Sequence, residues 1–308
     1  MTTGRHDRRR VVAVDVGGTK VLAGLVDAEG RASELMTVST PRTGGYALLE
    51  TVRSAAAALS ALATERGLDV VAGAVGTAGV VVGDVVVSAN ELLPHWAEVP
   101  LAAALSETLK VPVTVLNDVH ASALAEARIG AARDRNSALV VAVGTGIGGA
   151  LIQGGTVVPG RQGFAGSVGH IPAPSDEGRL CSCGARGHIE AYAGGRAIEL
   201  AFAERRKPGL DMRAISALAA QGDAEAAQLI SEAGELLGRV LGGAVTLVDP
   251  ELVVIGGGVA EIASFVNAVR RGMTREEMRP RSTAPLVRVA LGSRAVLTGA
   301  ALAAFDRR

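Results

Sequence analysis

Short apolar segments alternate with longer Ala/Leu-rich segments along this chain of 308 residues. The short segments are rich in β-branched residues, as in VVAVDV at 11–16, and their unbroken hydrophobicity is typical of buried strands. The same pattern predicts further strands at 21–27, 32–39, 70–76, 79–87, 111–116, 138–143, 150–153, 251–255 and 286–290.

The longer segments predict helices between these strands. Residues 222–247 carry the strongest helical pattern, and Asp223 is the expected N-cap. Because strands and helices alternate, we expect an α/β protein with a largely parallel sheet core. The other expected helices lie at 46–66, 98–110, 119–129 and 295–305, with a further one after the glycines at 256–258.

A faint internal repeat suggests how the chain is divided. A strand, a glycine turn and a second strand occur at 11–27 and again at 138–153. One hydrophobic core rarely grows beyond about 250–300 residues. The repeat and the length together predict two similar lobes around a cleft.

Composition excludes several classes of protein. Lys+Arg and Asp+Glu both number 31, and this zero net charge argues against nucleic acid as the main partner. Aromatic residues make up only 2% of the chain, too few for base-stacking platforms. Residues 136–160 carry no charge, but glycines interrupt them, so two buried strands fit better than a membrane span. With no secretory signal expected, we expect a cytoplasmic protein.

Two glycine turns follow strands and suit phosphate binding. Glycines let backbone N–H groups approach an anion closely. In the first turn, DVGGTK at 15–20, Asp15 can hold Mg²⁺, and Thr19 and Lys20 can donate to phosphate oxygens. Taken alone, a plain hairpin turn with a surface lysine explains this sequence as well. The second turn is GTGIGG at 144–149.

The second turn matches the dinucleotide fingerprint G-x-G-x-x-G, but its surroundings do not. That fingerprint requires a helix directly afterwards and an acidic residue about 20 positions later. A strand at 150–153 and Gly169-His170 stand there instead, so we discard the dinucleotide fold. The sequence G-x-x-x-x-G-K-[ST] does not occur, which excludes a P-loop. A third turn, at 256–258, suits either contact with adenine or a tight strand-to-helix connection.

Asn117-Asp118 ends a predicted strand, where open α/β sheets place their ligands. A carboxylate at this position can orient a hydroxyl group and accept its proton during phosphoryl transfer. Asp118 can also be the N-cap of the helix 119–129, and the two roles are compatible.

His170, Cys181, Cys183 and His188 lie within 19 residues of one another. Cysteines one residue apart rarely form a disulfide, and in a reducing compartment they favour metal ligation. Two thiolates and two imidazoles can supply the four tetrahedral ligands of Zn²⁺. A metal-free loop is the alternative.

In combination, these residues resemble the ROK family of sugar kinases and regulators, over about residues 11–305. The family motifs D-x-G-G-T-K, N-D and G-T-G-I-G-G occur at 15–20, 117–118 and 144–149. The family's zinc signature is G-H followed by C-x-C-G-x-x-G-C-x-E, and this chain has GH at 169–170 and CSCGARGHIE at 181–190. Glycines 256–258 and the sequence GAA at 299–301 also match.

The resemblance implies a two-lobed actin/hexokinase-like fold, in which ribonuclease H-like lobes are duplicated around an interlobe cleft. The N-terminal lobe would span 1–118 and regain the C-terminal helix 296–308. The larger lobe would span 119–295 and carry a zinc loop at 161–196.

It also implies ATP-dependent phosphorylation of a hexose or hexosamine, such as glucose, N-acetylmannosamine or N-acetylglucosamine, at the 6-hydroxyl. Polyphosphate is an alternative donor. The implied cofactors are Mg²⁺ and a structural Zn²⁺, and the implied assembly is a homodimer or higher homo-oligomer without nucleic acid or membrane partners.

Residue roles follow from the matched motifs, with Asp118 as the catalytic base. Nucleotide and its phosphates would be bound by Asp15, Gly17, Gly18, Thr19, Lys20, Gly144, Thr145, Gly146, Gly257 and Gly258. Sugar would be contacted by Gly79, Asn90, Asn117, Asp118, Ser167, His170 and Glu190, and zinc by His170, Cys181, Cys183 and His188. We expect Trp96, in a loop that resembles one in the family, to pack rather than stack on the sugar.

Two positions depart from the family pattern. The family usually has A-G-E-x-G-H, whose Glu binds sugar hydroxyls, and here Ser167 replaces that Glu. His188 stands where the third zinc cysteine is expected. The first departure bears on which sugar is used, and the second on metal affinity.

Two other functions compete with the kinase. A sugar-responsive regulator of the family would carry an added N-terminal helix-turn-helix, whereas the first kinase strand here is expected from Val11. A catalytically weak sugar-binding protein is suggested by Ser167. Intact phosphate turns and Asp118 favour the kinase over both.

Overall fold

The structure, a computed structural model, describes residues 8–89, 93–175, 178–206, 209–276 and 284–307. The chain forms two compact units. The first comprises Met1–Asp134, Gly155–Phe164 and Ala290–Arg308, and the second comprises Arg135–Gly154 and Ala165–Val289.

The first unit is built on a five-stranded sheet of order β3-β2-β1-β4-β7. β1 pairs antiparallel with β2 and parallel with β4, which in turn pairs parallel with β7. Three parallel strands therefore end at the same edge of this sheet. The strands are β1 (Arg9–Val16), β2 (Lys20–Val26), β3 (Ala32–Ser39), β4 (Asp69–Thr77) and β7 (Val113–Asn117).

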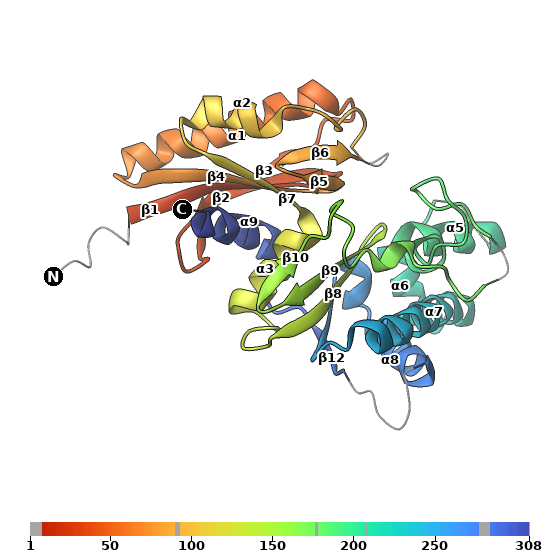
Figure 1. Ribbon diagram of the computed structural model, residues 1–308. Helices are drawn as coiled ribbons and strands as arrows, with labels where there is room; N and C mark the ends of the chain where they lie inside the picture. The colour runs from red at the N-terminus through yellow and green to blue at the C-terminus, as the bar shows by residue number, and fades with distance from the viewer. Residues whose placement is uncertain (1–7, 90–92, 176–177, 207–208, 277–283, 308) are drawn as a thin grey trace. The chain divides into compact units, whose positions relative to one another are not determined.

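Helices cover both faces of this sheet (Figure 1). α1 (Gly45–Glu65) and α2 (Leu101–Leu109) lie on one face, and α3 (Asp118–Ile129) and α9 (Ala295–Asp306) lie on the other. Alternate residues of β1 serve the two faces, since Val12 and Val14 join the α1–α2 core while Ala13 joins the α9 core. This double coverage explains the unbroken hydrophobicity of the strand sequences.

Residues 79–87 form two strands rather than the one strand that the sequence suggested. β5 (Val80–Val82) and β6 (Val85–Ser88) pair antiparallel. The chain reverses at Gly83 and Asp84, which have φ values of 57° and 65°. Because left-handed backbone cannot continue a strand, the expected single strand is wrong in this detail.

The second unit contains a sheet whose order includes β9-β8-β11-β12. β8 pairs antiparallel with β9 and parallel with β11, which pairs parallel with β12. Its first strand thus has the same kinds of neighbours as β1, which confirms the internal repeat. The strands are β8 (Ser137–Val143), β9 (Ile147–Gln153), β11 (Val253–Gly256) and β12 (Leu286–Arg288); β10 (Thr156–Val158) follows β9 in the chain.

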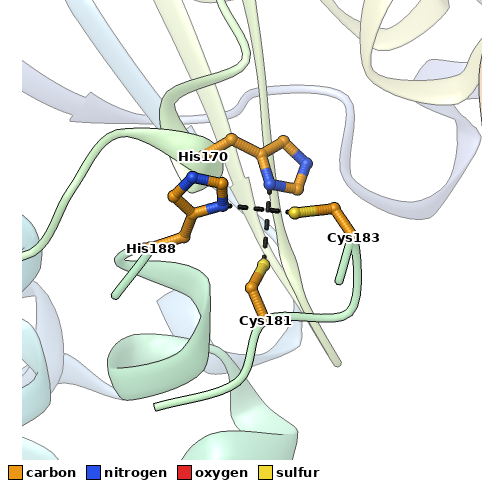
Figure 2. Close-up of side chains that lie close together, drawn as sticks. All are labelled: His170, Cys181, Cys183 and His188. Carbon is orange, nitrogen blue, oxygen red and sulfur yellow. Dashed lines mark hydrogen bonds between the residues drawn. The ribbon is translucent and has the colours of Figure 1, made fainter. Parts of the chain in front are cut away.

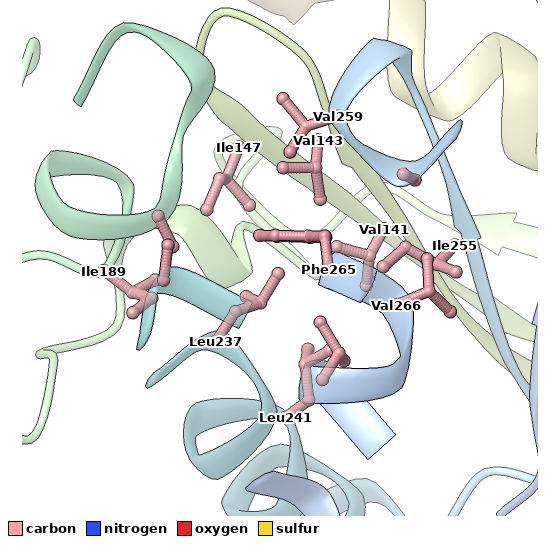
Figure 3. Packing of buried hydrophobic residues seen from close by; sticks show 14 of the residues in the cluster. Val141, Val143, Ile147, Ile189, Leu237, Leu241, Ile255, Val259, Phe265 and Val266 are labelled. Carbon is pink, nitrogen blue, oxygen red and sulfur yellow. The ribbon is translucent and has the colours of Figure 1, made fainter. Parts of the chain in front are cut away.

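Long helices form the core of the second unit with one face of β8. α7 (Ala224–Val248) begins at the expected N-cap, because the Asp223 carboxylate accepts hydrogen bonds from the N–H groups of Glu225 and Ala226. In Figure 3, Phe265 lies in the packed core beside Val141 and Leu237. The other helices are α4 (Glu190–Ala193), α5 (Gly195–Arg205), α6 (Met212–Ala220) and α8 (Ala263–Glu276).

Two further expectations concern the helix after the glycines at 256–258 and the boundary between the lobes. The glycines at 256–258 lead first into a short 3-10 turn, Gly258–Glu261, and only then into α8. Residues 119–134, expected in the larger lobe, group with the first unit because α3 packs against α9. The predicted boundary between the N-terminal lobe and the larger lobe, at residue 118, stays a prediction.

Candidate functional site

The first set of predicted site residues gathers at one edge of the first sheet. Asp15 lies opposite Gly76 across the β1–β4 pair, and Thr77 lies opposite Asn117 across the β4–β7 pair. These positions are at the carboxyl ends of parallel strands, where α/β sheets bind ligands. The structure thus places Asp15 and the Asn117-Asp118 pair at the same edge.

Asn117 and Asp118 occupy different positions at the start of helix α3. The N-cap is Asn117, whose side-chain oxygen accepts the N–H of His120 at 3.0 Å. Asp118 is the first helical residue, and its Oδ1 accepts the adjacent N–H of Val119 at 2.8 Å. The alternative of Asp118 as N-cap is therefore wrong.

Both carboxyl groups at this edge have raised pKa values. Burial is the main cause for Asp118, and three hydrogen bonds, from its own backbone, Val119 and Asn117, oppose it. For Asp15, burial and then the charge of Asp118 raise the pKa to about 7, while Lys20 lowers it. A raised pKa makes a carboxylate a stronger base, and such shifts are common where catalysis needs them.

The first glycine turn closes the β1–β2 hairpin. Gly17 N–H donates to Lys20 O at 3.1 Å, and Thr40 holds the turn from outside through hydrogen bonds to Thr19 O and Gly17 O. Thr19 and Lys20 are exposed beyond it. The turn is therefore the hairpin that the sequence predicts. The exposed side chains of Thr19 and Lys20 can still donate hydrogen bonds to a phosphate group.

Gly79 is fixed beside Asn117. The Asn117 side-chain amide donates to Gly79 O at 2.8 Å. Gly79 has a φ of 108°, and a Cβ there would lie 2.3 Å from Ser88 O, so only glycine fits. Asn90, the other sugar residue expected in this region, lies outside the described residues.

Trp96 packs inside the first unit, as expected. Its ring is fully buried, and its Nε1–H donates to Thr77 Oγ1 at 2.9 Å. A buried indole whose only polar group is satisfied cannot stack on a sugar. Its contact instead supports the end of β4, next to Asn117 in the sheet.

The second set of predicted residues belongs to the second unit, and its centre is the β8–β9 hairpin turn. Gly144 and Gly146 lie in this turn, and Thr145 between them is exposed. A Cβ at Gly144 would meet nothing within 4 Å, so packing does not require glycine there. The open space is what a phosphate group would need for close contact with the backbone.

The third glycine turn combines a structural glycine with an open one. Gly257 has a φ of 91°, and a Cβ there would lie 2.4 Å from Val143 O. Gly258 has neither constraint, since a Cβ there would meet nothing within 4 Å. A tight turn therefore explains why residue 257 is glycine. Contact with a ligand such as adenine remains the expected reason for glycine at 258.

Ser167 lies on a segment that packs along β9. A Cβ at Gly149 would lie 2.1 Å from Gly166 O, and a Cβ at Gly169 would lie 2.0 Å from Ile147 O. Ser167 O accepts the N–H of His170 at 3.1 Å, which closes a short turn and places His170 at its exposed end.

The four Cys and His residues meet in one cluster. Their ligand atoms all lie within 4.8 Å of one another (Figure 2). Cys181 Sγ lies 3.6 Å from His170 Nδ1, and Cys183 Sγ lies 3.2 Å from His188 Nδ1. Tetrahedral Zn²⁺ with ordinary bond lengths separates S and N ligands by about 3.6 Å. The donor set and spacing therefore fit zinc.

Glu190 connects this cluster with the hairpin turn. Its Oε2 accepts the N–H of Ile147 at 2.9 Å, and its Oε1 accepts the hydroxyl of Ser182. Sequence reasoning assigned Glu190 to the sugar alone and missed Ser182. No local pattern indicates either contact, because Ile147 and Glu190 are 43 positions apart.

Glu126 is a second residue that sequence reasoning missed. Its side chain is fully buried in α3, and its carboxylate accepts the N–H groups of Ala131, Ala290 and Leu291 at 2.7–3.1 Å. These hydrogen bonds link the C-terminal end of α3 to the segment that precedes α9. A glutamate in an Ala-rich helical sequence normally faces solvent, so the sequence carries no signal for this role.

None of the helices in the described ranges has both the length and the hydrophobicity needed to cross a membrane.

Comparison with known proteins places the chain in a family. Residues 11–307 match the ROK family. The chain is 31% identical to a glucokinase of Streptomyces coelicolor, over 94% of this chain and 96% of that protein. It is 31% identical to an N-acetylmannosamine kinase of Shigella flexneri, over 86% and 89%.

A solved structure agrees in both sequence and fold. The ROK family glucokinase of Streptomyces griseus, determined in complex with glucose and AMPPNP, superposes with a TM-score of 0.84. It is 31% identical, over 96% of this chain and 99% of that one. The fold is thus the actin-like sugar kinase fold, and the chain belongs to the ROK family.

Proposed function

We propose that this protein transfers the γ-phosphoryl group of ATP to the 6-hydroxyl of a hexose or hexosamine. The observation that carries the proposal is the Asn117-Asp118 pair at the carboxyl edge of the first sheet, where the charge of Asp118 acts on the neighbouring Asp15. The relatives named glucokinase and N-acetylmannosamine kinase support the substrate class.

Asp118 is the base in this proposal. As the sugar oxygen forms its bond to the γ-phosphorus, the bond from that phosphorus to the ADP oxygen breaks and the hydroxyl proton passes to Asp118. The Val119 N–H donates to Oδ1, and in this proposal the sugar hydroxyl approaches Oδ2. The raised pKa of Asp118 strengthens it as an acceptor, provided that it is ionised when sugar binds.

The two glycine turns would hold the phosphates. On the first unit, Thr19 and Lys20 extend from the hairpin turn, and Asp15 is the candidate ligand for Mg²⁺. Bound Mg²⁺ would neutralise phosphate charge. On the second unit, the N–H groups of Thr145 and Gly146 have no acceptor in the described part of the chain, so they can donate to phosphate oxygens.

Zinc would have a structural role. His170, Cys181, Cys183 and His188 supply its ligands, and all come from the stretch between β10 and α4. Because both histidines direct Nδ1 to the cluster, each keeps Nε2 for another partner. For His170, which is exposed, that partner would be a sugar hydroxyl.

Within the substrate class, Ser167 is the residue we expect to set sugar preference. The serine side chain is shorter than the Glu usual in the family and carries no charge. It accepts fewer hydrogen bonds, and it leaves room for a bulkier or differently configured sugar, such as an N-acylated hexosamine. Glucose is the alternative substrate.

A substrate panel tests the function. Purified protein would be mixed with ATP and Mg²⁺ and offered hexoses, N-acetylhexosamines and amino sugars, with ADP formation coupled to NADH oxidation. Phosphorus NMR of the product would identify the 6-phosphate, and polyphosphate would replace ATP in a parallel series. Turnover of at least one sugar to its 6-phosphate is expected. No sugar-dependent ADP formation across the panel would contradict the proposal.

A further inference from the structure

The second phosphate turn is held from one side by the segment that starts at Glu190. Gly195 N–H donates to Gly144 O at 2.8 Å, and Arg196 N–H donates to Thr145 O at 3.0 Å. These donors are the first N–H groups of α5, which a helix leaves without internal partners. The carbonyl groups of the turn are thus occupied on the α5 side.

Glu190 completes this support on the β9 side of the turn. Its Oε2 accepts the Ile147 N–H, the first N–H after Gly146. A Cβ at Gly146 would lie only 2.4 Å from this oxygen, so the carboxylate packs directly against the turn. The Glu190 carboxylate and the α5 amides therefore fix the turn, while the N–H groups of Thr145 and Gly146 stay available.

The other Glu190 oxygen connects the turn to the metal cluster. Oε1 accepts the hydroxyl of Ser182, which lies between the two cysteines of the cluster. Oε1 also lies 3.6 Å from Cys181 Sγ. One carboxylate thus contacts both the Cys181–Cys183 loop and the phosphate turn. The path from the metal ligands to the turn consists of Ser182, Glu190 and Ile147.

We propose that Glu190 is a positioning residue that couples zinc binding to nucleotide binding. When the loop is ordered by its metal, Ser182 holds Glu190, and Glu190 holds the turn in the conformation that presents its N–H groups. Without the metal, the loop no longer fixes Ser182, and the turn loses one of its supports. This inference rests on the proposed function, because it takes the turn as the phosphate site.

The competing role for Glu190 is direct contact with sugar. The two roles differ in which ligand responds to substitution. A sugar contact changes sugar affinity and leaves nucleotide affinity unaltered. A positioning role changes nucleotide affinity even when no sugar is present, and it makes that affinity depend on zinc.

The test measures the dissociation constant of a non-hydrolysable ATP analogue by calorimetry, on full-length protein without sugar. Wild type would be compared before chelation, after chelation and after zinc reloading. Hydrogen bonds of this kind contribute about 1 kcal/mol each, or about fivefold in affinity. We expect chelation to weaken analogue binding about threefold to tenfold, and reloading to restore it.

Three variants separate the steps. Glu190→Ala removes both contacts and should weaken analogue binding about tenfold or more. Glu190→Gln should largely rescue it, because its amide oxygen can accept from Ile147 while its NH₂ donates to Ser182. Ser182→Ala should keep zinc yet lose most of the effect of chelation on analogue affinity. Glu204→Gln, an exposed position on α5, is the matched control and should behave as wild type.

Several outcomes overturn the inference. Analogue binding by Glu190→Ala within twofold of wild type, together with weakened sugar binding, assigns Glu190 to the sugar. If chelation leaves the affinity of wild type for the ATP analogue unchanged, zinc binding and nucleotide binding are not coupled, whatever the variants show. If Glu190→Ala is unfolded by circular dichroism, Ser182→Ala and wild-type chelation decide alone. Wild type that turns over no sugar refutes the proposed function, whereas failure of these tests in an active kinase refutes only the coupling.

Discussion

Asp118 lies close enough to Asp15 for its charge to affect the pKa of Asp15. Burial is the larger cause of the shift, the charge of Asp118 is the second, and together they raise the pKa of Asp15 to about 7. Lys20 acts in the opposite direction. The candidate base and the candidate Mg²⁺ ligand are therefore electrostatically linked in the metal-free protein.

This link predicts how Asp15 responds to its neighbours. Asp118→Asn should lower the pKa of Asp15, because a nearby negative charge is removed, but burial should keep it above the ordinary value of 3.8. Lys20→Ala should raise it. Carboxyl ¹³C NMR titration of metal-free protein measures both shifts. Asp211→Asn, at the N-cap of α6, is the control, and an Asp15 pKa unchanged in both variants would refute the link.

A second prediction concerns the buried carboxylate of Glu126. Glu126→Gln replaces one charged acceptor oxygen by an NH₂ group that faces backbone N–H donors. Hydrogen bonds to charged groups contribute about 1.5–3 kcal/mol, so the free energy of unfolding should fall by about 2–3 kcal/mol. Urea denaturation measures this loss. Glu107→Gln, at an exposed position on α2, should change stability by less than about 0.5 kcal/mol. Equal effects of the two substitutions would argue against the role of Glu126.

A third prediction concerns metal content. Gently purified protein should carry one Zn²⁺ per chain, measured by plasma mass spectrometry. Burial raises the pKa of the Cys181 thiol to about 11 in the metal-free loop, so zinc must displace its proton and binding should strengthen as pH rises. Cys183→Ser should lower zinc retention. Fully active protein that contains no zinc would contradict the assignment.

The fourth prediction concerns sugar preference. Ser167→Glu should restore a charged acceptor for sugar hydroxyls, so kcat/KM should shift towards glucose relative to N-acylated hexosamines. Sites that hydrogen-bond a hydroxyl discriminate strongly, because an unpaired buried group is costly. Ser167→Ala is the control and should leave the preference near that of wild type. A wild type that already prefers glucose, with a Ser167→Glu variant that merely loses activity, would show the idea to be wrong.

Much of the fold could be predicted because its signals are local. The helix start at Asp223 follows from a side chain that caps its own next turn, and the β8–β9 hairpin follows from two apolar runs around glycines. The predicted strand at 79–87 failed at Gly83 and Asp84, where an apolar pattern continues across a reversal of the chain. Hydrophobic periodicity does not report left-handed backbone when valines stand on both sides of the turn.

The site residues likewise divide into those that local sequence motifs indicate and those whose role depends on contacts between distant segments. Motifs indicated Asp118 and the four-residue metal cluster, because residue type and spacing carry that chemistry. Contacts between distant segments carry no such pattern. Glu126 meets Ala290 across 164 positions, and the structure was needed to show that its carboxylate is buried. The reason for Gly146 is also non-local, since the space that a Cβ would take is filled by Glu190.

The kcat of Asp118→Asn with the preferred sugar and saturating ATP tests the central claim most directly. Asn keeps a hydrogen-bonding group but cannot accept the hydroxyl proton, so kcat should fall by about 10²–10⁴, the range for loss of a general base. Sugar affinity, measured by calorimetry on the same protein, should stay within a few-fold of wild type. A variant that keeps more than about a third of the wild-type kcat would contradict Asp118 as the base.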